Sequence, residues 1–274
     1  MTDLPQRAAS TGASTPANAL RAVGILPARL GSTRLPRKML LAETGLPLFV
    51  HSARNVQRCP AIERVVVATD SDEIARAGAE VGIEVVMTDP AHPSGTDRVH
   101  EALSGLDASY DVVVNVQADE PDVEPDDLAA LVAAFADPDV HAATLCAPIE
   151  DEDERHSPNV VKVVRDERGD AMYFSRSPIP STAHAREGAD RASPMTRHVG
   201  VYAFRPAALA RFCGLRVGRI EALENLEQLR WLEAGERMRV LPARRVPRGI
   251  DTRTDYEAFV ARTHSESHST RESQ

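Results

Sequence analysis

The sequence contains no long apolar run. No stretch of its 274 residues approaches the ~20 consecutive apolar residues that a membrane-spanning helix requires. The sequence therefore excludes an integral membrane protein. Hydrophobic residues still make up 42% of the chain, which is enough to bury a sizeable core in one large domain or two small ones.

An excess of basic residues is also missing. The chain has 32 Lys and Arg against 41 Asp and Glu, which gives a formal net charge of -9. With that charge balance, an extended binding surface for the phosphate backbone of a nucleic acid is not expected. The charge balance does not exclude a local basic site for a small phosphorylated ligand.

Cysteine is scarce. The three cysteines, Cys59, Cys146 and Cys213, lie far apart in the chain, and their spacing matches no metal site. Reduced, buried thiols in a cytoplasmic protein are the expected state.

Both ends of the chain lack the pattern of an ordered domain. Residues 1–20 are rich in Ala, Ser, Thr and Pro and contain no apolar segment of a secretory signal, so we expect a disordered leader. Residues 264–274 are polar and are expected to form a disordered tail. The ordered body is expected over residues 21–263 as a single α/β domain.

Short β-branched runs alternate with helical patterns in the first half of this body. The predicted strands are Val23–Pro27, Arg64–Thr69, Ile83–Met87, Asp111–Val116 and Ala142–Cys146. The predicted helices are Phe49–Arg58, Asp72–Val81, Asp97–Leu106 and Pro125–Phe135. Ser71 and Ser94 are the expected N-caps of two of them. Continuous apolar strands that alternate with helices predict a doubly wound, mostly parallel sheet covered on both faces.

The pattern changes after about residue 150. Val160–Val164 and His198–Phe204 are predicted as strands, separated by a loop-rich link over Ser177–Pro194. Ile220–Ala234 is predicted as a single helix with its leucines on one broad face, ended by Gly235. We expect residues 150–235 to form a smaller excursion that covers a pocket or builds an oligomer contact.

The loop after the first strand carries the main candidate chemistry. Ligands of open α/β sheets bind at the carboxyl ends of the strands, and this loop holds Arg29, Arg34, Arg37 and Lys38 with Gly, Ser and Thr between them. Backbone N–H groups and cations in that combination suit a triphosphate. The loop lacks the Walker and G-x-G-x-x-G patterns, which argues against P-loop hydrolysis and the usual dinucleotide fold. A solvated basic surface loop is the alternative.

Further polar residues are expected at the same edge of the sheet. Asp119 follows the fourth predicted strand, and a carboxylate beside a polyphosphate site indicates Mg²⁺. Ser94–Arg98 opens a helix whose N-terminal N–H groups suit a nucleotide. Asp251 is a candidate second carboxylate for the metal. Capping and turn roles are the alternative for each of these residues.

Several short motifs follow one another along the chain. They are Arg29-x-x-Ser32-Thr33-Arg34-Leu35-Pro36-x-Lys38, Val65-Val-Val-Ala-Thr69-Asp70, Ser94-Gly95-Thr96-Asp97-Arg98, Asn115-Val116-Gln117-x-Asp119-Glu120-Pro121, Pro158-Asn159-x-Val161-Lys162-Val163-Val164, Tyr173-Phe174-Ser175-Arg176, Pro178-Ile179-Pro180, Arg197-His198-x-Gly200-x-Tyr202, Leu226-Glu227-Gln228-Leu229-Arg230 and Asp251-Thr252. In this order they resemble the CMP-sugar nucleotidyltransferase family over residues 22–262, nearly the whole ordered body.

The resemblance implies a Rossmann-like nucleotide-diphospho-sugar transferase fold with a sugar-binding and dimerisation part. It implies transfer of CMP from CTP to the anomeric hydroxyl of 3-deoxy-manno-octulosonate (Kdo), with diphosphate released and Mg²⁺ as cofactor. It also implies a cytoplasmic homodimer whose product feeds lipopolysaccharide synthesis.

The resemblance assigns roles to individual positions. Arg29 and Lys38 would hold the triphosphate and act with Asp119 in catalysis, and Asp119 and Asp251 would be the magnesium ligands. The remaining substrate-binding residues would be Ser32, Arg34, Arg98, Gln117, Arg176, His198, Tyr202, Glu227 and Gln228. The guanidinium of Arg176 would suit the sugar carboxylate. No side chain is predicted as the general base.

The sequence departs from the family pattern at Ala118, where Gly is usual, and at Arg37 and Met39, where Gly and Pro are usual. If position 118 needs a positive φ, Ala is costly there. Ala118 therefore leaves two alternatives open. One is a cytidylyltransferase for 8-amino-Kdo or a sialic-type acid, although the motifs from Arg197 to Gln228 favour Kdo. The other is a catalytically silent protein that binds nucleotide sugars.

Overall fold

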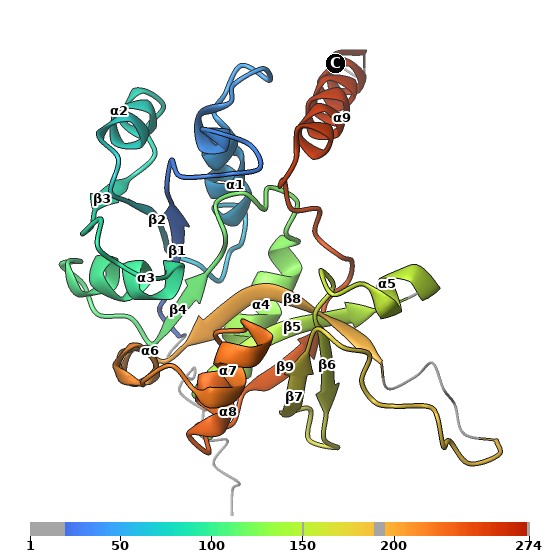
Figure 1. The fold of residues 1–274 in the computed structure, drawn as a ribbon. Helices are drawn as coiled ribbons and strands as arrows, with labels where there is room; N and C mark the ends of the chain where they lie inside the picture. The colour runs from blue at the N-terminus through green and yellow to red at the C-terminus, as the bar shows by residue number, and fades with distance from the viewer. Residues whose placement is uncertain (1–19, 150, 189–194, 273–274) are drawn as a thin grey trace, which may run out of the picture.

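The computed structural model describes residues 20–149, 151–188 and 195–272. A nine-stranded sheet forms its centre, and its main path has the order β3-β2-β1-β4-β8-β5-β9 (Figure 1). Four parallel strands make up the first half, namely β1 (Ala22–Ala28), β2 (Arg64–Thr69), β3 (Val85–Met87) and β4 (Val112–Asn115). Except for Leu20, the predicted leader lies outside the described residues.

The second half of the sheet contains the excursion. Strand β8 (Thr196–Phe204) lies antiparallel between β4 and β5 (Ala142–Pro148), while β9 (Arg239–Pro242) runs parallel to β5. Strands β6 (Lys162–Arg165) and β7 (Ala171–Ser175) form an antiparallel pair that joins the sheet through β8. These pairings confirm the mostly parallel α/β sheet.

Helices pack on both faces of the sheet because the strand residues alternate. Val112 and Val114 of β4 belong to the apolar cluster on one face, and Val113 belongs to the cluster on the other. The first face is covered by α1 (Leu48–Val56), α2 (Asp72–Glu80) and α4 (Pro125–Ala134). The second is covered by α3 (Gly95–Ser104), α6 (Pro206–Gly214) and α8 (Leu229–Glu233), and α7 (Arg219–Glu224) packs against α8. The short helices η1 (Lys38–Leu40) and α5 (Glu152–His156) lie in connecting segments.

The predicted strands, and the helices predicted before residue 150, lie within two residues of those in the structure. Both predicted N-caps are confirmed. The hydroxyl of Ser71 accepts a hydrogen bond from the N–H of Ile74 at 3.3 Å, and that of Ser94 accepts one from Asp97 at 3.2 Å. The three cysteines are free, and Cys59 and Cys146 are buried as expected.

The prediction of one helix over Ile220–Ala234 was wrong. Asn225 adopts a left-handed conformation with φ 51°, which separates α7 from α8. Asn tolerates that conformation better than most residues. The break turns Leu226 into the core and leaves Leu223 86% exposed, so the leucines do not share one face. Gly235, with φ 79°, follows the end of α8 as predicted.

The carboxyl-terminal segment also differs from the expectation. The structure continues α9 (Arg253–Glu272) through residues for which the polar sequence predicted a disordered tail. Apolar packing anchors the start of this helix, since Tyr256 and Phe259 form a small cluster with Leu35, Leu48 and Ile250. Among the described residues, no helix has the length and apolar character needed to cross a membrane.

Candidate active site

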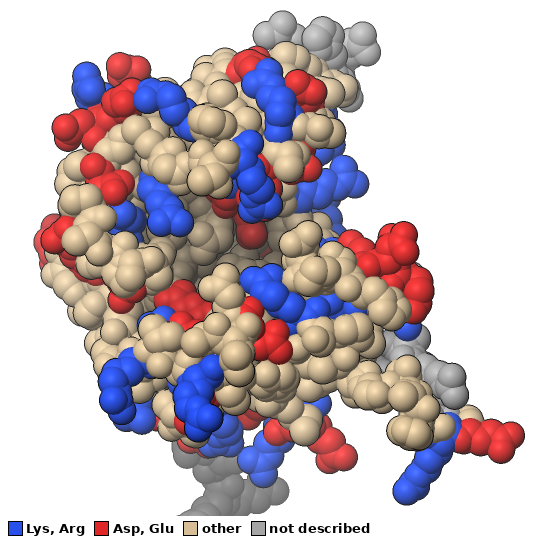
Figure 2. Space-filling view, in the orientation of Figure 1, with Lys and Arg blue, Asp and Glu red and all other residues tan. Residues whose placement is uncertain are grey.

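A cavity of about 340 Å³ opens at the carboxyl ends of β1 and β4. Figure 2 shows a hollow in the middle of this face with acidic and basic side chains around it. We call it the charged cavity because its lining includes four cationic and two acidic side chains: Arg29, Arg34, Lys38, Arg98, Asp119 and Asp251. Two further predicted residues, Ser32 and Gln117, also line it.

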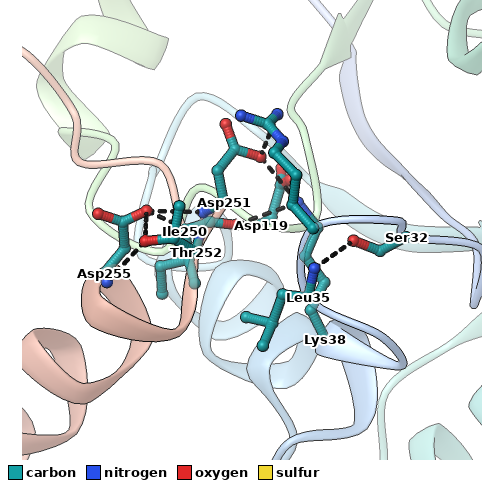
Figure 3. A network of polar contacts seen from close by, with 9 residues as sticks. Ser32, Leu35, Lys38, Asp119, Ile250, Asp251, Thr252 and Asp255 are labelled. Carbon is teal, nitrogen blue, oxygen red and sulfur yellow. Dashed lines mark hydrogen bonds and ion pairs between the residues drawn. The ribbon is translucent and has the colours of Figure 1, made fainter.

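Lys38 joins the two acidic residues of the cavity. Its ammonium donates hydrogen bonds to the carbonyl oxygen of Ile250 at 3.0 Å and to Oδ1 of Asp251 at 3.2 Å, and it forms a short ion pair with Asp119 (Figure 3). The Lys38 side chain is only 11% exposed. A lysine so shielded from water requires charge partners, and the two carboxylates supply them.

Hydrogen bonds hold together the three segments, far apart in sequence, that carry Lys38, Asp119 and Asp251. The N–H of Ile250 donates to the carbonyl of Asp119 at 3.0 Å, which ties the late segment to the end of β4. The Asp255 carboxylate accepts from the N–H groups of Asp251 at 3.2 Å and Thr252 at 2.8 Å, at the start of α9. The location of Asp251 is thus set by the N-terminal turn of that helix.

The other cations differ in how far they are already paired. Arg98 is buried, forms an ion pair with Asp70 at 3.2 Å and donates to the Thr88 hydroxyl. Arg34 forms an exposed ion pair with Asp251 at 3.0 Å. Arg29 has no hydrogen bond or ion pair with any residue that the structure describes, so its guanidinium can bind an anion in the cavity.

The acidic residues fit a hard divalent cation. Asp119 and Asp251 converge on one point, and the adjacent Glu120 has a buried Oε2 with no hydrogen-bond partner. Desolvation, followed by the charges of Asp119 and Asp251, raises the pKa of Glu120 to about 8. Within the described ranges, no group of three or more His, Cys, Asp or Glu side chains forms a closed metal site. Two carboxylates that leave the other coordination positions free suit Mg²⁺, because this ion usually retains several water ligands and also binds substrate phosphates.

A second group of predicted residues lies beside the cavity, and we call it the inner polar cluster: His198, Tyr202, Glu227 and Gln228. Glu227 accepts hydrogen bonds from the hydroxyls of Ser94 at 2.8 Å and Thr96 at 3.0 Å. Desolvation raises the pKa of Glu227, and these two hydroxyls partly oppose the rise. Ser94 also lines the charged cavity, so the two regions are adjacent.

His198 is neutral and its tautomer follows from its neighbour. Desolvation lowers the pKa of His198 to about 3. The Thr144 hydroxyl lies 2.8 Å from the carbonyl oxygen of Val201 and 2.9 Å from Nε2 of His198. If the single hydroxyl proton goes to the nearer carbonyl, Nε2 of His198 donates to the hydroxyl oxygen, and this arrangement satisfies all three groups. Nδ1 is then left as a hydrogen-bond acceptor.

Arg176 is held by main-chain carbonyls. Its guanidinium donates to the carbonyls of Glu224 at 2.8 Å, Pro158 at 2.9 Å and Asn225 at 3.2 Å. These bonds fix the turn between α7 and α8, which carries Glu227 and Gln228. The binding of a sugar carboxylate by Arg176 stays a prediction.

The structure shows the backbone conformation and the surroundings of Ala118 and Arg37, two positions at which the sequence departs from the family pattern. Ala118 has a buried Cβ in the apolar cluster, and its carbonyl accepts a hydrogen bond from Ser52 at 2.8 Å. Arg37 and Asn225 are the non-glycine residues with positive φ in the described part of the chain, so the backbone conformation at position 118 does not require glycine. Arg37, at φ 56°, does adopt the conformation that favours glycine.

The structure thus brings eight predicted residues into one cavity and leaves five outside its lining, namely Arg176 and the inner polar cluster. Sequence reasoning missed the roles of Thr144, Glu224 and Asn115. No local sequence pattern marks Thr144 or Glu224, because their contacts join segments that are distant in sequence. The sequence does mark Asn115, because it is a polar residue within a run of valines.

Comparisons with known proteins find relatives that match most of the chain. A sequence model of the cytidylyltransferase family matches residues 23–238. A 3-deoxy-manno-octulosonate cytidylyltransferase of Nitratidesulfovibrio vulgaris is 45% identical over 238 residues, which cover 86% of this chain and 94% of the relative. One of Rhodopseudomonas palustris is 47% identical over 239 residues, covering 85% and 94%. The solved structure of a CMP:2-keto-3-deoxy-manno-octonic acid synthetase with CTP has a TM-score of 0.82 and 37% identity, covering 90% of this chain and 99% of that one.

Proposed function

The chain belongs to the cytidylyltransferase family, and we propose that it transfers CMP from CTP to the anomeric hydroxyl of Kdo, releasing diphosphate. The observation that carries the proposal is the charged cavity, where Lys38 bridges Asp119 and Asp251 while Arg29 is left without a partner among the described residues. The relatives named for the same reaction match this chain over most of its length.

In this reaction the anomeric hydroxyl attacks the α-phosphorus of CTP and diphosphate leaves in line. Such transfers depend mainly on positioning and on neutralising charge. Arg29 and Lys38 supply positive charge from one loop, and Arg98 adds a buried guanidinium from α3. Because Asp70 and Thr88 already hold Arg98, we assign it to shaping the nucleotide pocket.

We further propose that Mg²⁺ is the cofactor and that Asp119 and Asp251 hold it. The support is the convergence of these carboxylates on one point and the unpartnered oxygen of Glu120 behind them. When bound, Mg²⁺ would neutralise phosphate charge and help to activate the sugar hydroxyl. Titration of the protein with Mn²⁺, followed by electron paramagnetic resonance, should show one bound ion per chain in the wild type and loss of binding in Asp119→Ala.

The inner polar cluster suits the sugar acid, because its side chains offer both hydrogen-bond donors and acceptors. Nδ1 of His198 accepts, and Gln228 and Tyr202 can donate. Ala118 has no positive φ, and its side chain packs in the apolar cluster. These observations give no support to an altered sugar preference or a loss of activity caused by Ala118. We therefore favour active turnover with Kdo over the other acids.

The test is diphosphate release from CTP and Mg²⁺ with Kdo, 8-amino-Kdo and sialic acid in parallel. We expect strong release with Kdo and little with sialic acid. CTP binding without release in any reaction would instead support a silent homologue. Preference for another acid would reassign the sugar.

We propose a homodimer as well, formed through the apolar side chains that the α7 region exposes: Val217, Ile220 and Leu223. Burying them against a second copy removes apolar surface from water. Light scattering should give twice the chain mass, and Leu223→Asp should give the monomer mass. A wild-type monomer would overturn this proposal.

CTP is a cytoplasmic nucleotide, so we propose the cytoplasm as the site of action and the supply of activated Kdo for lipopolysaccharide as the role. Cell fractionation with an antibody to the chain checks the location. Recovery in another compartment would contradict it.

A further inference from the structure

The Asn115 side chain is buried without a hydrogen-bond partner. It is 1% exposed, and neither Oδ1 nor Nδ2 finds a partner among the described residues. Buried amides are normally hydrogen-bonded, and an unpaired one destabilises the fold. Such an amide is completed either by a buried water or by a ligand, and the position of Asn115 decides which of the two we test.

The register of the sheet places Asn115 next to Tyr202, a member of the inner polar cluster. Asn115 pairs with Tyr202 of β8, and residues at paired positions point to the same face of a sheet. Alternation along β4 places Asn115 on the face of Val113, which α3, α6 and α8 cover. Gln117, two residues further on, lines the charged cavity.

A second unpaired amide lies on the same side of the sheet. Gln228 is 3% exposed, and its Nε2 has no hydrogen-bond partner among the described residues. Its neighbours Leu226 and Leu229 belong to the same apolar cluster as Val113. Two buried amides that share one face and lack partners indicate a ligand with several hydroxyl groups, since hydroxyls both donate and accept.

We propose that Asn115, next to Tyr202 of the inner polar cluster, is a sugar-binding residue, with its amide hydrogen-bonded to hydroxyls of the bound sugar acid. Oδ1 accepts from one hydroxyl and Nδ2 donates to another. The assignment rests on the proposed function, because it takes Kdo as the sugar. It adds a residue from the sheet itself to those carried by the surrounding loops and helices.

The test compares Asn115→Leu with the wild type. Leu has nearly the shape of Asn and no polar atoms, so the free variant should melt at the same temperature or higher. The KM for Kdo should rise roughly tenfold, as expected for the loss of a buried hydrogen bond, while the KM for CTP stays unchanged. Val113→Ala is the matched control on the same strand and face, and it should lower the melting temperature and leave both KM values unchanged.

Asn115→Ser supplies a second variant that keeps one hydroxyl, and its KM for Kdo should lie between those of the wild type and Asn115→Leu. If Asn115→Leu melts at a lower temperature and keeps its KM for Kdo, the amide serves the fold through a buried water and the proposal is wrong. If Asn115→Leu does not fold, an unchanged KM for Kdo in Asn115→Ser also overturns the proposal. Failure of the wild type to use Kdo would instead overturn the proposed function.

Discussion

The charged cavity and the inner polar cluster lie side by side but are built in opposite ways. In the cavity, the ammonium of Lys38 forms ion pairs with both Asp119 and Asp251 before any ligand arrives. In the cluster, His198 is neutral because desolvation lowers its pKa to about 3, and Gln228 has an unpaired amide. One region is built on ion pairs, while the other is more deeply desolvated and partly unpaired.

The difference shows how one site recognises two unlike substrates. A triphosphate is highly charged, and the binding energy of each new ion pair can offset the loss of an existing one. Hydroxyl groups bring no charge, so they are recognised by buried groups that would otherwise stay unpaired. Such groups reject analogues that lack the hydroxyl, because the protein atoms then remain unsatisfied. We expect the cavity to determine the turnover rate and the cluster to determine which sugar is used.

Asp119→Ala should have the largest effect. Removing this carboxylate takes away the proposed metal ligand, and kcat should fall by roughly 100-fold or more, as for other preorganised electrostatic groups. The measurement is diphosphate release at saturating CTP and Kdo. Asp122→Ala is the control, since Asp122 is an acid of the same loop that pairs with Arg262 at 2.7 Å and lies outside the cavity lining. Unchanged turnover in Asp119→Ala would remove the metal assignment.

Lys38→Ala should act mainly on CTP. The variant loses one of the four cations that line the cavity and leaves Asp119 and Asp251 without their ammonium, so the triphosphate meets less positive charge. We expect the KM for CTP to rise by roughly tenfold or more, the size of a lost charge-assisted hydrogen bond. Arg37→Ala is the neighbouring control, because Arg37 pairs with Glu73 on the surface. A CTP dependence equal to that of the wild type would refute the triphosphate role.

The cavity was more accessible to sequence reasoning than the cluster. Arg29, Ser32, Arg34 and Lys38 are close neighbours in one loop, and their position after the first strand places them at the ligand-binding edge. The strand that precedes Asp119 is a clear apolar run. Local pattern and one topological rule therefore predicted where this half of the site lies.

The cluster depends on long-range contacts that no local pattern records. The tautomer of His198 is set by Thr144 from another strand. The position of Glu227 depends on the break at Asn225, which an uninterrupted leucine periodicity concealed. The three carbonyls that hold Arg176 become neighbours only when the chain folds. Sequence motifs named these residues, but only the packed structure shows what holds them.

His198→Gln sharpens the comparison through pH. The folded protein keeps His198 neutral down to a pKa of about 3, whereas the unfolded chain takes up the proton near pH 6.5. Below pH 6.5 the unfolded state therefore binds more protons, and stability falls as pH falls towards 3, by at most about 1.4 kcal/mol per unit. Denaturant unfolding between pH 7 and 5 should show this slope in the wild type and a smaller one in His198→Gln. Equal slopes in both proteins would mean that His198 is accessible to protons.

His198→Gln should also raise the KM for Kdo more than that for CTP, since only the cluster loses its acceptor. The same pair of KM values separates this variant from Lys38→Ala, which should show the opposite preference. A change of equal size in both values would mean that the two regions do not act separately.

Ala118→Gly should have the smallest effect, although position 118 adjoins Asp119. Ala118 has no positive φ, and its Cβ packs in the apolar cluster beneath the cavity. Glycine there gives up that packing and frees the unfolded backbone, so the free energy of unfolding should fall by roughly 0.5–1 kcal/mol. Turnover with Kdo should stay within about twofold, since that change corresponds to well under 1 kcal/mol. Denaturant unfolding and diphosphate release on the same preparation measure both quantities. A large gain in turnover would mean that Ala118 restrains Asp119 after all, and that the charged cavity is not fully formed in the natural sequence.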